Sequence, residues 1–205
     1  MNDTALQTAK ELLSHSKKIV VIGHKNPDGD AIGSCLALSF FLKKLGHDTQ
    51  VLMPNDFPEF LKWLPGCENI LLFEKDREET TKLVNEADII FTLDFNALNR
   101  TGELGTVLEK VTTHFIMIDH HQQPDSYAVV TYSDVTMSST SEMVYHFIDK
   151  LEGLKKIDAS IATNLYAGIM TDTGSFRFPS TSATTHKGIA HLIECGANNS
   201  AIHQN

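Results

Sequence analysis

Short apolar runs alternate with amphipathic stretches along this chain. Residues 19–22, 89–93 and 115–118 are almost entirely Ile, Val, Leu, Phe and Met, and such runs are typical of strands that are buried on both faces. Weaker apolar runs predict further strands over 50–53, 70–73 and 128–132. The segments between the strands carry helical patterns, over 4–15, 29–46, 56–64, 75–85, 138–150, 157–169 and 182–195. This alternation predicts an α/β fold, doubly wound, with a mainly parallel sheet flanked by helices.

Composition narrows the class of protein. A chain of 205 residues can bury one substantial core. Its formal net charge of −9 argues against a basic face that holds long duplex nucleic acid. The three cysteines are widely spaced, which favours reduced thiols and a cytoplasmic protein. No apolar stretch approaches the length of a membrane span, so we expect no membrane contact.

Four acidic or histidine motifs follow apolar runs of the pattern. They contain His24, Asp28 and Asp30; Asp94; Asp119, His120 and His121; and Asp172. Because the strands of a parallel sheet deliver their carboxyl ends to one edge, these side chains are expected to converge there. Carboxylate oxygens and imidazole nitrogens together suit a divalent metal such as manganese.

Each motif taken alone has an ordinary alternative. Asp28 and Asp30 also suit a turn with a helix N-cap, and Asp94 suits a common turn after a strand. The Asp119–His121 triplet also suits an exposed polar turn. Asp172 follows an apolar helix, where a carboxylate opposes the helix dipole and needs a compensating cation.

The four motifs together resemble a known family. Residues 24–34 read His-Lys-Asn-Pro-Asp-Gly-Asp-Ala-Ile-Gly-Ser, Asp94 and Asp119-His-His follow in order, and residues 168–177 read Gly-Ile-Met-Thr-Asp-Thr-Gly-Ser-Phe-Arg. This order and spacing resemble the DHH phosphoesterase family, and within it the bacterial oligoribonuclease and pAp-phosphatase (nanoRNase-type) branch, over essentially the whole chain. The resemblance implies a two-metal phosphoesterase that uses activated hydroxide on short oligoribonucleotides, linear or cyclic dinucleotides, or pAp.

The same resemblance implies a role for each motif residue. It implies that the site binds two Mn²⁺ ions, with Mg²⁺ as the alternative metal. The first ion is bound by His24, Asp28 and Asp94; the second is bound by Asp30, Asp94, His120 and Asp172. Asp94 would bridge the two ions. The catalytic residues would be Asp119, which orients a neighbouring ligand, and His121, which faces the phosphate.

Two arginines are further candidates for binding substrate. A guanidinium group matches phosphate oxygens in a bidentate manner, so Arg100 and Arg177 are expected to bind the substrate phosphate. An ordinary surface ion pair remains the alternative for both. The start of the helix at 138–141 suits either a capping role or backbone contacts to phosphate.

The end of the chain suggests a domain boundary. Residues 198–205 look like an N-cap followed by a single helical turn, and the family continues into a smaller domain that this chain lacks. We therefore expect residues 1–196 to form the catalytic domain and 197–205 to begin a linker or helix towards a C-terminal substrate-binding domain. The exposed surface would favour self-association as a homodimer.

Two other functions fit the same motifs. An inorganic pyrophosphatase or exopolyphosphatase of the same superfamily would share the early motifs, although Gly29, Gly33 and residues 174–177 favour the nucleotide branch. A non-catalytic metal- or nucleotide-binding module belongs to a different class. The intact set of predicted ligands argues against it.

Overall fold

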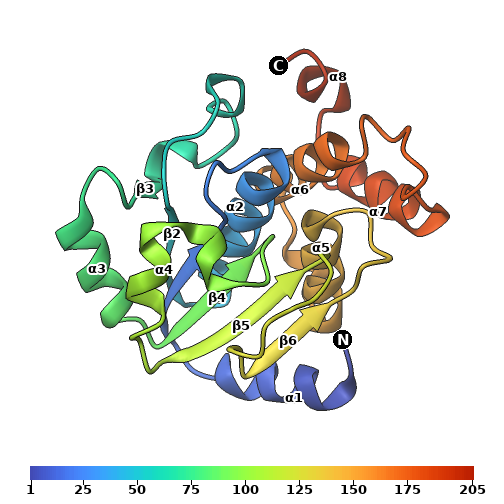
Figure 1. Cartoon of the computed structure of the whole chain (residues 1–205). Helices are drawn as coiled ribbons and strands as arrows, with labels where there is room; N and C mark the ends of the chain where they lie inside the picture. The colour runs from blue at the N-terminus through green and yellow to red at the C-terminus, as the bar shows by residue number, and fades with distance from the viewer.

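A six-stranded sheet in which all strands are parallel forms the centre of the computed structural model, which describes residues 1–205 (Figure 1). Its strands are β1 Lys18–Ile22, β2 Asp48–Met53, β3 Leu71–Leu72, β4 Ile89–Leu93, β5 His114–Asp119 and β6 Val130–Ser133. Their order across the sheet is β3-β2-β1-β4-β5-β6, and every neighbouring pair is parallel. The order therefore reverses between β1 and β4, which is where open α/β sheets bind ligands.

Helices cover both faces of this sheet, which confirms the doubly wound architecture. They are α1 Asp3–Leu12, α2 Gly29–Lys44, α3 Arg77–Asn85, α4 Glu103–Leu108, α5 Thr140–Lys150, α6 Ala159–Asp172, α7 Ala183–Glu194 and α8 Asn199–Ile202. Strand β1 shows how the two layers form, because its side chains alternate between the faces. Val20 and Ile22 pack with α3 and α4, whereas Ile19 and Val21 pack into the larger core with α2, α5 and α6.

Helices α2 and α6 pack unusually closely because glycine lies at their contact. A Cβ atom at Gly33 of α2 would lie 2.5 Å from the carbonyl oxygen of Asn164 in α6. At Gly168 of α6, a Cβ atom would collide with the side chain of Ser141 in α5. Only glycine permits this approach, and it brings the start of α2, the end of α6 and the start of α5 together at one edge of the sheet.

The structure differs from the elements predicted from the sequence in three segments. The helix expected over 56–64 is absent; two 3-10 turns, Glu59–Leu61 and Cys67–Asn69, occupy this part of the chain. Pro58 and Pro65 each lack a backbone N–H and interrupt any longer helix. The strand expected over 70–73 is reduced to two residues, and α4 was not predicted because its six residues follow Gly102 without a capping side chain.

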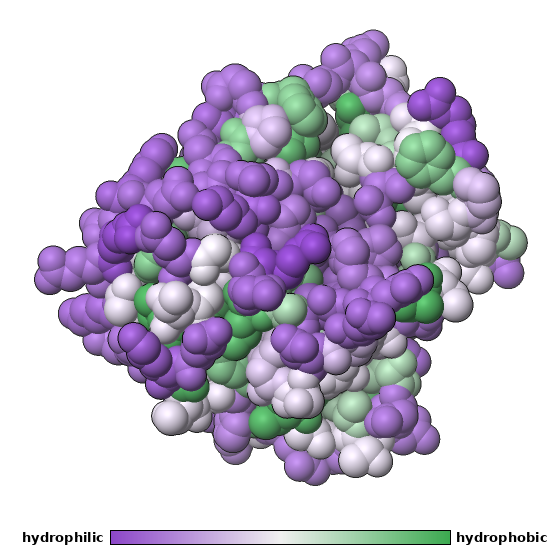
Figure 2. Space-filling view, in the orientation of Figure 1, coloured by the Kyte–Doolittle hydropathy of each residue, from purple (hydrophilic) through white to green (hydrophobic).

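The surface agrees with the composition. In the view of Figure 2, hydrophilic residues dominate and hydrophobic residues form separate patches. None of the helices combines the length and apolar character that crossing a bilayer requires. The three cysteines are free thiols, as the sequence predicts.

Candidate metal centre

The loop between β1 and α2 carries the first motif. The Oδ1 atom of Asp28 accepts hydrogen bonds from the backbone N–H groups of Asp30 and Ala31, both at 3.0 Å, so Asp28 is the N-cap of α2. His24 donates from Nδ1 to the Lys25 carbonyl at 2.8 Å. This leaves Nε2 of His24 free, and it lies 3.9 Å from Oδ1 of Asp28. The carboxylate of Asp28 can therefore cap α2 and also bind a metal ion together with His24.

Asp94 lies at the middle of the cluster. It follows β4 with φ at +64° and is 2% exposed. A left-handed conformation is uncommon outside glycine, and such strain is often found at functional sites. Here it places Oδ2 at 3.4 Å from Nε2 of His24 and Oδ1 at 3.6 Å from Nε2 of His120. The two oxygens of one carboxylate thus face imidazoles from two different motifs.

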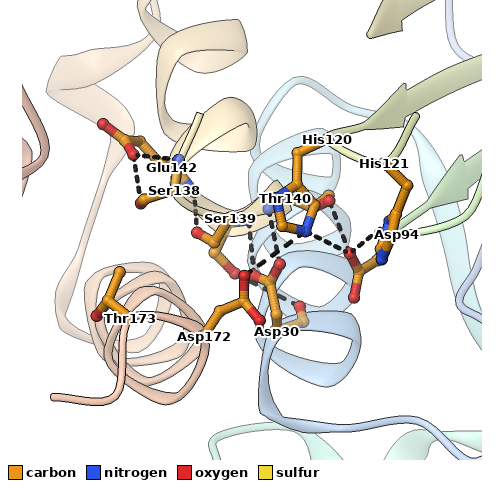
Figure 3. A network of polar contacts seen from close by, with 12 residues as sticks. Asp30, Asp94, His120, His121, Ser138, Ser139, Thr140, Glu142, Asp172 and Thr173 are labelled. Carbon is orange, nitrogen blue, oxygen red and sulfur yellow. Dashed lines mark hydrogen bonds and ion pairs between the residues drawn. The ribbon is translucent and has the colours of Figure 1, made fainter. Parts of the chain in front are cut away.

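Two further carboxylates come from helices α2 and α6. Asp30 is 1% exposed, and its oxygens accept the backbone N–H groups of Thr140 at 2.6 Å and Ser141 at 2.8 Å. Asp172 is the last residue of α6, and its Oδ2 lies 3.5 Å from Nε2 of His120. The fourth motif therefore reaches the cluster from a helix end rather than a strand end, and Figure 3 shows its approach from the α6 side.

Burial and like charge oppose ionisation inside this cluster. Burial, followed by the charges of Asp94 and Asp172, raises the pKa of Asp30 well above its ordinary value. Burial also raises the pKa of Asp172, with His120 opposing this shift and Asp94 adding to it. At His24, burial favours the neutral ring, but the carboxylates of Asp28 and Asp94 outweigh it and raise the pKa to about 10. A bound cation would offset this cost and favour the ionised form of the carboxylates.

The geometry of these donors fits divalent metal. Three groups have donor atoms that all lie within 4.8 Å of one another: His24, Asp28 and Asp94; Asp30, His120 and Asp172; and Asp94, His120 and His121. Every group combines carboxylate oxygen with imidazole nitrogen, a mixture that Mn²⁺ accepts and that Mg²⁺ uses less often. All six residues expected to bind metal are therefore brought together.

Asp119 and His121 form a hydrogen-bonded pair at the side of this cluster, where Nδ1 of His121 also lies 3.9 Å from Oδ1 of Asp94. Asp119 is fully buried, and its Oδ1 accepts a hydrogen bond from Nδ1 of His121 at 2.7 Å while Oδ2 accepts the His121 backbone N–H at 3.0 Å. Asp119 thus orients His121, whereas the sequence suggested that it orients a metal ligand. The bond to Asp119 raises the pKa of His121, and Nε2 of His121 makes no hydrogen bond to protein.

The two candidate arginines differ in their surroundings. Arg100 belongs to the 3-10 turn Leu98–Thr101, whose carbonyl at Arg100 accepts the backbone N–H of Lys25 at 2.9 Å. Its charge opposes protonation of His121, more weakly than the hydrogen bond to Asp119 favours it. Arg177 is exposed and donates from Nε to the Gly174 carbonyl within its own loop, at 2.6 Å.

The segment at the start of α5 has a role that the sequence did not reveal. Ser139 is the N-cap, accepting the N–H of Glu142 at 3.0 Å. The N–H groups of Thr140 and Ser141 bind Asp30, and Thr140 Oγ1 also donates to Asp94 at 2.9 Å (Figure 3). Asp30 thus accepts the N–H groups of Thr140 and Ser141, and the Ser139 side chain caps the helix, which confirms the capping role that the sequence suggests.

Known proteins share both this sequence and this fold. A family model described as "DHH family, N-terminal domain" matches residues 18–169. The bifunctional oligoribonuclease and PAP phosphatase NrnA of Thermus thermophilus is 34% identical over 87% of this chain and 50% of its own length. The cyclic-di-AMP phosphodiesterase GdpP of Bacillus subtilis is 26% identical, over 92% of this chain and 29% of its own length.

A solved structure extends the similarity to three dimensions. The exopolyphosphatase-related protein from Bacteroides fragilis superposes with a TM-score of 0.97 and 37% identity, covering 99% of this chain and 60% of that protein. The chain spans about half the length of the oligoribonuclease relatives that it matches. With the family model covering most of the chain, and with the motif residues gathered at one edge of the sheet, the protein belongs to the DHH family.

Proposed function

We propose that this protein is a divalent-metal-dependent phosphoesterase that hydrolyses short oligoribonucleotides, linear or cyclic dinucleotides, or pAp. The observation that carries the proposal is Asp94, whose two carboxylate oxygens face His24 and His120 at 3.4 and 3.6 Å. A carboxylate shared between two imidazoles from different motifs is suited to bridging two metal ions.

The distances support the ligand sets that the resemblance to the DHH family implies. His24, Asp28 and Asp94 would hold one ion, while Asp30, His120, Asp172 and the other oxygen of Asp94 would hold the second. Two such ions, when bound, activate water and stabilise the attacking and leaving oxygens of an in-line displacement. The donor set favours Mn²⁺, with Mg²⁺ as the alternative.

His121 would act on the phosphate rather than on the metal. Its Nδ1 is held by the buried carboxylate of Asp119 at 2.7 Å, so Nε2 is the atom available to substrate. The raised pKa of His121 favours the protonated ring, and Nε2 would donate that proton to the leaving oxygen. Arg100 would add positive charge to the same side of the site.

The charge of the chain limits the size of the substrate. A long polymer needs a basic track along its backbone, and the net charge here is −9. Short nucleotides need only a few phosphate contacts, and the similar proteins NrnA and GdpP are named as enzymes that act on such substrates. Arg177 is proposed as a second contact to the nucleotide, although its Nε is held by the Gly174 carbonyl.

One similarity favours a second candidate function. The structure with a TM-score of 0.97 is described as exopolyphosphatase-related, and polyphosphate would present a phosphoanhydride, in place of a phosphate ester, to a two-metal site. The two functions differ in their products. Hydrolysis of pApA yields AMP, and hydrolysis of pAp yields AMP together with inorganic phosphate, whereas polyphosphate yields inorganic phosphate and a shorter polyphosphate.

A direct competition tests the proposal. The protein would be incubated with Mn²⁺ and with pApA, pAp, pyrophosphate or polyphosphate, and the products would be separated by chromatography. We expect nucleotides to be hydrolysed faster than the inorganic substrates, and EDTA and Asp94→Asn to remove the activity. Preference for polyphosphate would establish the second candidate instead, and hydrolysis that survives chelation would contradict both.

A further inference from the structure

Five consecutive polar residues are buried at the start of α5. Ser138, Ser139, Thr140, Ser141 and Glu142 are each no more than 3% exposed. Buried polar groups are costly unless they are hydrogen-bonded, so the partners of this segment indicate what it does. Those partners lie on two sides, with the candidate metal centre in front and helix α7 behind.

On the front side, Thr140 contacts two carboxylates of the centre at once. Its backbone N–H donates to Oδ2 of Asp30 at 2.6 Å, and its Oγ1 donates to Oδ1 of Asp94 at 2.9 Å. Ser141 adds a second backbone bond to Asp30 at 2.8 Å. Asp30 comes from α2 and Asp94 from the end of β4, so Thr140 links two separate elements (Figure 3).

On the rear side, Glu142 anchors the segment. Its Oε2 accepts the Ser138 N–H at 3.1 Å, the Ser138 hydroxyl at 2.5 Å and the Thr185 hydroxyl of α7 at 3.1 Å. Its other oxygen lies 3.7 Å from Nε2 of His146, one helical turn further along α5. The front residues are therefore held by a buried network and not by a mobile loop.

From this arrangement, we propose that Thr140 is a positioning residue for the metal centre, with Glu142 holding it in place. The inference rests on the proposed metal-dependent function. A carboxylate can rotate about its Cβ–Cγ bond, and Asp94 must keep one oxygen towards His24 and the other towards His120. The hydroxyl of Thr140 sets that rotation, and its N–H fixes Asp30 beside it.

A set of hydroxyl substitutions tests the proposal through metal binding itself. Thr140→Val keeps the shape of the side chain and removes the donor, whereas Thr140→Ser keeps the donor. Thr80→Val is the matched control, because Thr80 is also buried and hydrogen-bonded but lies on α3. The affinity of each protein for Mn²⁺ would be measured by calorimetry, with thermal unfolding in EDTA as the check on folding.

We expect Thr140→Val to weaken Mn²⁺ binding by about 10- to 100-fold, as is typical when a group that orients a metal ligand is lost. Thr140→Ser should restore most of the affinity, and Thr80→Val should match the wild type. If Thr140→Val does not fold, Thr140→Ala removes the same donor without placing a methyl group against the Asp94 carboxylate. Glu142→Gln should give a smaller loss than Thr140→Val.

The possible failures are distinguishable. A wild-type protein that binds no Mn²⁺ contradicts the proposed function itself. Wild-type affinity in Thr140→Val or Thr140→Ala, or equal losses in the Ser and Val variants, overturns the positioning role while leaving the proposed function standing. Unchanged affinity in Glu142→Gln would overturn the anchoring role of Glu142.

Discussion

The two ends of strand β4 carry the same residue type in opposite situations. Asp88 precedes the strand, is exposed, and accepts the backbone N–H of Lys18 at 2.8 Å. Asp94 follows the strand, is 2% exposed, and lies among His24, His120 and two further carboxylates. An exposed carboxylate is stabilised by water, whereas a buried one needs specific partners. Burial beside like charge, and not residue type, distinguishes the two edges.

A surface depression lies at the opposite edge of the sheet, where the strands begin, and not beside the candidate metal centre. A depression of about 460 Å³ there is lined by Asp88, Lys17, Lys110 and His114 together with five neighbours. These charged groups are spread over solvated surface and none is forced against a like charge. Size alone therefore does not locate the chemistry of this fold; the convergence of carboxylates at the carboxyl ends of the strands does.

The largest difference in metal binding between the two edges of the sheet should appear when the aspartates on either side of β4, Asp88 and Asp94, are replaced one at a time. Asp94→Ala should abolish binding of both Mn²⁺ ions and reduce hydrolysis to background, because Asp94 faces both ligand sets. Asp88→Ala should retain both ions, and His24→Ala should weaken only one. Elemental analysis after gel filtration measures this; two equivalents of metal in Asp94→Ala would show that Asp94 is not the bridging ligand.

The histidine that begins strand β5 and the one that lies two residues after its end provide a second matched pair. His121→Ala should lower kcat by about 10²- to 10⁴-fold, the usual loss of a general acid, while metal remains bound. His114, exposed at the start of the same strand, should tolerate alanine with little change in kcat. Steady-state kinetics with metal analysis tests both, and a His121→Ala enzyme with normal turnover would exclude it as the acid.

Substitutions at two helix glycines test how tightly the helices pack at the edge of the sheet that carries the candidate metal centre. Gly33→Ala forces a methyl group against the Asn164 carbonyl and should lower the free energy of unfolding by about 1–3 kcal/mol. In α7, a Cβ at Gly188 meets only Tyr145 at an ordinary 3.6 Å, so Gly188→Ala should stabilise by about 0.5–1 kcal/mol. Urea unfolding measures both; equal effects would mean that the α2–α6 contact adapts freely.

The smallest expected effect is on pH dependence at the opposite edge. His47 precedes β2, is 5% exposed, and has no hydrogen bond to either ring nitrogen. Burial, followed by the charge of Lys17, lowers its pKa. Below the ordinary histidine pKa of about 6.5, the unfolded chain therefore binds more protons than the folded one, and stability falls.

Replacing this histidine should flatten that pH dependence. His47→Leu should show a smaller loss of stability between about pH 7.5 and pH 5.5 than the wild type, because the buried ring no longer titrates. His114→Ala, at an exposed position, is the control for the loss of a histidine. Urea midpoints across the pH range measure the effect, and an equal slope in wild type and His47→Leu would contradict it.

The sheet could be predicted because each of its longer strands has a recognisable pattern in the local sequence. Ile89–Leu93 coincides with the predicted strand, and the β1, β2, β5 and β6 runs differ only at their ends. Short apolar segments bounded by polar residues need no tertiary information to be recognised as buried strands. Segments that depend on tertiary contacts were less predictable, as shown by the 3-10 turns near residue 60 and by the short α4.

The proposed ligand residues were also recognisable from the sequence, but the residues that hydrogen-bond to them were not. His24, Asp94, His120 and Asp172 stand out because acidic and imidazole groups directly follow apolar runs. Thr140 and Glu142 looked like an ordinary helix start, since a Ser/Thr cluster with Glu in the first turn suits capping. Only the approach of α5 to α2 and β4 gives that segment its contacts with Asp30 and Asp94.

The sequence by itself determined the element order, the parallel sheet and the set of residues that converge at one edge, because strand periodicity and the placement of polar groups after strands are encoded locally. The tertiary structure decided which atoms meet. It oriented Asp94 between two histidines, paired Asp119 with His121, and used the start of α5 to hold Asp30. These outcomes depend on close helix packing at Gly33 and Gly168, and contacts between segments more than a hundred residues apart, such as that between Asp30 and Thr140, leave no local pattern in the chain.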